Sequence, residues 1–139
     1  MTHVKQLAHI CLSTTDLSAT ERFFAQALGV HRLFAFHRAG DEFGFYLNVG
    51  GRTHVEVFRR DHAEHRDDNA INHLCLEVDD LEACIAQIRT AGYQVSDRKL
   101  GVDGTWQAWT QDPGGARIEL FEYTAESAQF TGGDREADW

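Results

Sequence analysis

The sequence contains an internal repeat. The segment AHICLSTTDL at 8–17 returns as NHLCLEVDDL at 72–81, and each copy carries a histidine at its second position. The match continues downstream, where THVEVF and ARIELF align Glu56 with Glu119. Two copies of one supersecondary unit are the simplest explanation, and two copies are too few for a solenoid. The repeat therefore predicts a pair of modules that face each other.

Each copy changes its hydrophobic period in the same order. Residues 8–13 alternate apolar and polar side chains, which predicts a half-buried strand. A helical stripe follows, with Asp16 able to cap its start and Gly29 able to end it. Its apolar members are Leu17, Phe24, Ala27 and Leu28, and the second copy repeats the design with Leu81, Cys84, Ile85, Ile88 and Gly92.

Three strand-like runs follow each helix. In the first copy they lie at about 30–38, 43–49 and 53–58, and in the second at about 93–99, 105–110 and 116–122. Each module therefore reads strand, helix, strand, strand, strand, which is an α+β fold. We expect one domain over 1–139, with module one at about 6–58, a charged linker at 59–71, module two at about 72–123 and a polar C-terminal tail at 124–139.

Charge and composition exclude several classes of partner. The net charge of -9 argues against nucleic acid and against anionic membrane surfaces, because both require clustered Lys and Arg. The N-terminus lacks the pattern of a signal peptide, and no run of 18 apolar residues occurs. Three cysteines are an odd number, which favours reduced thiols over a disulfide framework. We therefore expect a cytoplasmic protein.

Four polar residues occupy matched positions in the two copies. Strand alternation turns Glu56 and Glu119 away from the helices, onto the faces that also carry His9 and His73. If those faces turn towards one another, two imidazoles and two carboxylates converge, a set that suits a divalent metal. A lone His or Glu on a strand is usually solvated, but four at matched places favour a metal site. Cys11 and Cys75 share these faces, where we expect small packing residues rather than ligands.

The chain resembles the vicinal oxygen chelate superfamily, which includes glyoxalase I, methylmalonyl-CoA epimerase, extradiol dioxygenases, and fosfomycin and bleomycin resistance proteins. The resemblance covers 6 to about 123, and its most typical text is HLCLEVDDLEACIAQIRTAG and DPGGARIELFE. It implies a glyoxalase fold, in which two βαβββ modules form a U-shaped metal-binding cleft that is often completed in a homodimer.

The same resemblance implies an activity. The family's four ligand positions map onto His9, Glu56, His73 and Glu119, and glutamate in the second of them is similar to glyoxalase I. This favours proton transfer next to a carbonyl through a metal-bound enediolate, as in a lactoylglutathione lyase, with Glu119 or Glu56 as the proton carrier. The expected cofactor is one divalent ion, either nickel, cobalt, zinc or manganese.

The sequence says less about the substrate than about the type of reaction. In glyoxalase I an arginine four residues after the first ligand helps to hold glutathione, and here Ser13 takes that place. Candidate residues for binding a small carbonyl substrate are Ser13, Phe58, Gln107, Trp109 and Arg117. Gln107 and Trp109 share a strand face that suits a sugar-like ring, although Trp109 can equally be a core residue. An epimerase or isomerase of a sugar-like or cyclitol ketone is therefore the alternative, followed by a ring-cleaving dioxygenase and a metal-free binding protein.

Overall fold

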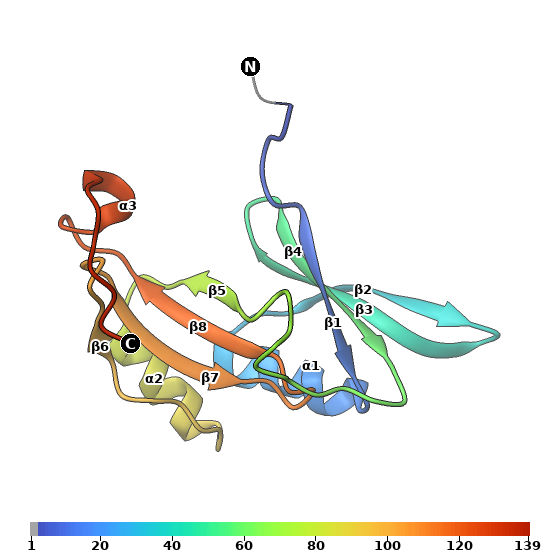
Figure 1. Ribbon diagram of the computed structural model, residues 1–139. Coiled ribbons are helices and arrows are strands. Elements are labelled where there is room, and N and C mark those ends of the chain that lie inside the picture. The colour runs from blue at the N-terminus through green and yellow to red at the C-terminus, as the bar shows by residue number, and fades with distance from the viewer. Residues whose placement is uncertain (1–2) are drawn as a thin grey trace. The chain divides into compact units, whose positions relative to one another are not determined.

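The two repeats fold as two units of the same topology. The computed structural model describes residues 3–139. The first unit runs to His65 and also includes Asp112–Ala116, and the second comprises Arg66–Gln111 and Arg117–Trp139. Figure 1 draws the first sheet in blue to green and the second in yellow-green to orange.

Each unit contains a strand, a helix and three further strands. The first has β1 (His9–Thr14), α1 (Leu17–Leu28), β2 (Arg32–Arg38), β3 (Asp41–Gly50) and β4 (Thr53–Arg59). The second has β5 (Leu74–Glu77), α2 (Leu81–Thr90), β6 (Lys99–Leu100), β7 (Trp106–Gln111) and β8 (Arg117–Glu122), followed by α3 (Ala128–Thr131). None of the helices formed by residues 3–139 has the length and apolar character that crossing a bilayer requires.

The sheets share one strand order. The first is ordered β1-β4-β3-β2 and the second β5-β8-β7-β6. In each sheet the first strand of the unit pairs in parallel with the last, and the remaining pairs are antiparallel. The predicted α+β fold of two tandem βαβββ modules is confirmed.

The predicted helix caps are also present. The Asp16 side chain accepts a hydrogen bond of 3.0 Å from the Ala19 N–H, and Gly29 ends α1 with φ of 65°. At the start of α2, the side chain of Asp80 accepts from the Ala83 N–H at 2.9 Å. Glu122 of β8 also accepts from the Leu81 N–H at 2.7 Å, so a strand side chain ties α2 to its sheet.

The core lies between each helix and one face of its sheet. Strand alternation places Val55, Val57, Ile118 and Leu120 in that core, all at most 2% exposed. The buried face of α1 extends beyond the predicted stripe, because Phe23 lies outside that stripe and is fully buried. Leu28, a member of the predicted stripe, is only half-buried. Thr20 is buried as well, and its hydroxyl donates to the Thr14 hydroxyl at 2.7 Å, which satisfies the polar group.

The prediction of a strand at 93–99 is wrong for most of that range. Only Lys99–Leu100 forms a strand, and Val95 makes one isolated bridge to Thr110. Side chains take the place of a regular ladder here. The Ser96 hydroxyl accepts from the Trp109 N–H at 2.9 Å, and Arg89 donates to the Val95 carbonyl at 3.3 Å and to Asp97 at 2.7 Å.

The predicted polar tail contains ordered structure. Helix α3 is anchored by the Ser127 hydroxyl, which accepts from the Thr105 hydroxyl at 3.1 Å, and by Asp103, whose carbonyl accepts from the Ala128 N–H at 2.7 Å. From α3 the chain runs back towards the second sheet (Figure 1). Trp139 lines the same pocket as Gln107 and Trp109 of β7. A short stretch of small and polar residues, without helical periodicity, gives no sequence signal for this helix.

Gly44 of β3 lies where a side chain has no room. Its register partner is Phe58 of β4, and a methyl group at Gly44 would overlap the Phe58 ring and lie 2.6 Å from the Val57 carbonyl oxygen. We expect Gly44→Ala to lower the free energy of unfolding by about 1–3 kcal/mol, measured by urea denaturation. The overlap with backbone cannot be relieved by a side chain, so adding Phe58→Ala should restore only part of the loss. Wild-type stability of Gly44→Ala would contradict this packing.

The buried carboxyl of Asp112 should make the free energy of unfolding depend on pH. It is 4% exposed, and burial raises the pKa of its carboxyl to about 6, although backbone N–H groups of the turn oppose the shift. A pKa raised above the unfolded value of 3.8 means that the folded state binds the proton more tightly, so this contribution to stability is lost as the pH rises from about 4 to about 6. This difference in pKa between the unfolded and folded states corresponds to at most about 3 kcal/mol of stability. We expect Asp112→Asn to flatten the dependence of unfolding free energy on pH across this range, and equal slopes in both proteins would refute it.

Candidate metal centre

The first unit brings His9 and Glu56 together. His9 begins β1, Glu56 lies in the neighbouring strand β4, and the parallel register sets Glu56 opposite Cys11. The Nε2 atom of His9 lies 3.4 Å from Oε1 of Glu56. Strand pairing thus brings together the two candidate ligands of this unit.

Aromatic rings surround Glu56. Tyr46 of β3 is its partner in the antiparallel register, and the Tyr46 ring stacks on Phe34 with centroids 4.8 Å apart. Burial raises the pKa of the Tyr46 hydroxyl, and the charge of Glu56 and a hydrogen bond to it add to the shift. Phe58, a predicted substrate residue, stacks on Phe43 at 5.5 Å. The face around Glu56 therefore combines aromatic rings with the polar groups of His9 and Tyr46.

The second unit brings His73 and Glu119 together in the same way. His73 directly precedes β5, Glu119 lies in β8, and Nε2 of His73 is 3.2 Å from Oε2 of Glu119. Burial raises the pKa of Glu119 to about 7, with a contribution from Asp103 and an opposing one from Arg117. Burial also lowers the pKa of His73, and the Arg117 charge adds to this. Both effects favour the neutral imidazole, which is the form that binds metals.

The distance between the two donor atoms of each pair can be compared with the spacing of adjacent ligands around a metal ion. Bonds of about 2.0–2.2 Å from an ion to nitrogen and oxygen place two adjacent ligand atoms about 3–3.5 Å apart. The His–Glu separations of 3.4 and 3.2 Å match that spacing in both units. Within residues 3–139, no three His, Cys, Asp or Glu side chains are grouped as a metal site, and each pair by itself supplies two donor atoms.

Three of the predicted substrate residues line one pocket of the second unit. The pocket has a volume of about 590 Å³ and also contains the His73–Glu119 pair. Its lining comprises His73, Lys99, Gly101, Val102, Asp103, Gln107, Trp109, Arg117, Glu119, Asp138 and Trp139. Trp109 is half-buried, so it belongs to the pocket wall and is not a core residue.

The other two predicted substrate residues lie in the first unit. Ser13 of β1 is exposed and is the register partner of Phe58 on β4. Gly114 of the turn approaches the Ser13 backbone so closely that a methyl group there would lie 2.5 Å from the Ser13 carbonyl oxygen. Ser13 and Phe58 are thus neighbours on the face that carries Glu56.

The two cysteines beside the pairs are neutral thiols. Burial raises the pKa of Cys75 to about 12, and the nearby Glu119 charge adds to the shift. The pKa of Cys11 is likewise raised by burial and then by Glu56. A protonated thiol is a poor metal ligand. Both residues are exposed, however, so the prediction that they pack between neighbouring side chains is wrong.

Three residues beside the pairs were not predicted from the sequence. Tyr46 contacts Glu56, Asn72 hydrogen-bonds His73 with Nδ1 and Oδ1 2.9 Å apart, and Asp103 acts on Glu119 through its charge. Strand alternation in EFGFYLNV could have placed Tyr46 on the open face. The position of Asn72 immediately before His73 carries no comparable signal.

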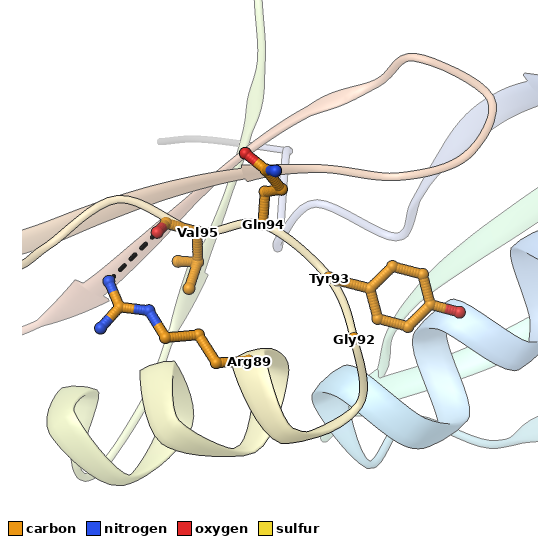
Figure 2. A pocket seen from close by; sticks show the side chains of 5 residues that line it. All are labelled: Arg89, Gly92, Tyr93, Gln94 and Val95. Carbon is orange, nitrogen blue, oxygen red and sulfur yellow. Dashed lines mark hydrogen bonds between the residues drawn. The ribbon is translucent and has the colours of Figure 1, made fainter.

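A second pocket lies at the C-terminal end of α2. Figure 2 shows Arg89 reaching the Val95 carbonyl at 3.3 Å while the Tyr93 ring points away from Arg89. Gly92 and Gln94 complete the lining. The pocket brings together one cation and no acid or nucleophile, so it offers no chemistry of its own.

A family model and the fold define the class of protein. The family model of the Glyoxalase/Bleomycin resistance protein/Dioxygenase superfamily matches residues 6–120, and the chain belongs to this superfamily. Its members include metalloenzymes and also proteins that are not enzymes.

Individual relatives agree with this assignment. The Escherichia coli K12 protein YaeR, itself described as uncharacterized, is 27% identical over 130 residues, which cover 88% of this chain and 99% of YaeR. A glyoxalase family protein from Enterococcus faecalis has a TM-score of 0.73 at 24% identity, covering 87% of this chain and 100% of its own. A lactoylglutathione lyase from Agrobacterium tumefaciens has a TM-score of 0.65 at 17% identity, covering 87% and 96%. At these identities the two structures show a shared fold.

Proposed function

We propose that the protein is a divalent-metal-dependent enzyme of the glyoxalase I type, which moves a proton at a carbon next to a carbonyl. His9, Glu56, His73 and Glu119 would supply the metal ligands. The observation that carries the proposal is the recurrence, in both units, of a His Nε2 and a Glu oxygen at the spacing of adjacent ligands. Membership of a superfamily rich in metalloenzymes supports it.

The donor set favours a borderline ion. Neutral imidazoles bind nickel, cobalt and zinc well, and carboxylates also suit manganese and offset the charge of the ion. When bound, the ion would act as a Lewis acid that stabilises negative charge developing on the carbonyl oxygen of a substrate. The proposed partners are a small carbonyl compound and a second copy of this chain.

A carboxylate would carry the proton in this reaction. We assign it to Glu119, which is 7% exposed and sits in the pocket of the second unit. Its carboxylate would take the proton from the carbon next to the carbonyl and return it to the same carbon or the adjacent one. Low exposure keeps bulk water from exchanging the proton in between. Glu56 would remain a ligand within its aromatic surroundings.

A second candidate function is epimerisation of a sugar-like ketone. The pocket of the second unit combines the indoles of Trp109 and Trp139 with the amide of Gln107. Aromatic faces and amides pair with the CH and OH groups of a polyhydroxylated ring. Inversion of the carbon beside the ketone would need Glu119 to remove the proton from one face and a second acid to return a proton to the opposite face.

The test is turnover by protein that has been stripped and reloaded separately with nickel, cobalt, zinc and manganese. The first substrate is the methylglyoxal–glutathione hemithioacetal, with bound metal measured in each sample. Metal-dependent lactoylglutathione formation would support the glyoxalase activity. Bound metal without turnover would favour the epimerase, and the absence of bound metal in every sample would contradict both.

A further inference from the structure

The orientation of His73 is set by its neighbour Asn72. The Nδ1 atom of His73 lies 2.9 Å from Oδ1 of Asn72, and the Arg117 guanidinium donates to the same Oδ1 at 3.3 Å. Arg117 can only donate, so this atom is the amide oxygen, an acceptor. In the neutral ring Nδ1 must then carry the proton, and the lone pair of Nε2 faces the Glu119 carboxylate. These two atoms, 3.2 Å apart, then share a single proton in the metal-free protein, and a cation could take the place of that proton.

Arg117 is itself held in place. Its guanidinium carbon lies 4.4 Å from the centroid of the Trp109 ring, within the range of a cation–π contact. Trp109 in turn meets the His73 ring edge to face, with centroids 4.8 Å apart and planes at 76°. The contacts close a ring from His73 through Asn72, Arg117 and Trp109 back to His73.

We propose that Asn72, Arg117 and Trp109 are positioning residues that fix the tautomer and the orientation of His73, so that Nε2 is presented to a divalent ion. We call these three residues the His73 clamp. The inference rests on the proposed function in taking His73 as a ligand. It also gives Arg117 and Trp109 a role other than the substrate binding predicted from the sequence. Partners of this kind commonly orient the histidine ligands of metal sites.

The clamp is a property of the second unit. Ala8 precedes His9 in the first unit, and the repeat aligns His54 with Arg117. The register partner of Glu56 is Tyr46, whereas that of Glu119 is Trp109. His9 also has a side chain 44% exposed, against 35% for His73. His73 is therefore the more rigidly held of the two imidazoles.

The experiment compares three single variants. Asn72→Leu removes the acceptor, Asn72→Asp keeps an acceptor oxygen for both His73 and Arg117, and Asn69→Leu is the matched control in the exposed linker. The first readout is the ¹⁵N NMR spectrum of the histidine rings in metal-free protein, which distinguishes Nδ1–H from Nε2–H. The second is the affinity for Co²⁺, measured by competition with a chelator.

Wild type, Asn72→Asp and Asn69→Leu should all show His73 as the Nδ1–H tautomer and bind Co²⁺ with similar affinity. Asn72→Leu should shift the ring towards Nε2–H and lower the Co²⁺ affinity about 10- to 100-fold. A wild-type ring protonated on Nε2, or an Asn72→Leu protein with unchanged tautomer and affinity, would overturn the clamp. Absence of Co²⁺ binding in wild type would instead overturn the proposed function, and the tautomer would still decide the clamp.

Discussion

Glu119→Gln should lower kcat of the metal-loaded protein about 10²- to 10⁴-fold while much of the bound metal is retained. The amide keeps an oxygen that can act as a ligand but cannot accept the proton from carbon. Glu119 is almost fully buried beside His73, so a replacement of the same size should leave the packing unchanged. Turnover and bound metal would be measured on the same samples.

Two further variants make this result specific. Glu126→Gln changes an exposed glutamate outside the pocket and should leave kcat unchanged. Glu56→Gln tests the other carboxylate, which we expect to affect metal affinity more than the proton transfer. Normal turnover by Glu119→Gln would remove Glu119 from the role of base.

Replacing either paired histidine should have the largest effect on metal binding. His9→Ala and His73→Ala each leave one glutamate without its nitrogen partner, at a contact of 3.4 or 3.2 Å in the intact protein. We expect each change to lower the affinity for nickel or cobalt at least about 100-fold, because even partners that only orient a ligand are worth 10- to 100-fold. Isothermal titration calorimetry measures the effect.

The matched control is His62→Ala. His62 is an exposed histidine of the charged linker, so its loss should leave metal affinity unchanged. Equal losses in all three variants would indicate adventitious binding to surface histidines. Unchanged affinity in both His9→Ala and His73→Ala would contradict the proposed ligand set.

Much of the fold was predictable because the repeat and the hydrophobic period agree. The alternation in HVEVF and RIELF fixed which face of each strand is buried, and Asp16 and Gly29 marked both ends of the first helix. The prediction failed at 93–99, where hydrogen bonds from side chains replace a regular ladder. It also missed Phe23, because a helix packed against a sheet buries a wider face than one stripe.

The site was predictable only in part. Alternation and the repeat identified His9, Glu56, His73 and Glu119 as residues on the open faces of neighbouring strands, although the register partners of the two glutamates are Cys11 and Cys75. Asn72 could not be found this way, because its role depends on the rotamer of its side chain and on Arg117, far along the chain. Contacts between side chains of distant segments leave no periodic trace in a sequence.

The most direct measurement is X-ray absorption spectroscopy at the metal edge of the nickel- or cobalt-loaded protein. The proposed centre predicts about one ion per chain, with two imidazole nitrogens and carboxylate oxygens at about 2.0–2.2 Å. The imidazole signal should weaken in His73→Ala. A bound ion without imidazole scattering, or a protein that retains no ion after dialysis, would contradict a metal centre built from the two His–Glu pairs.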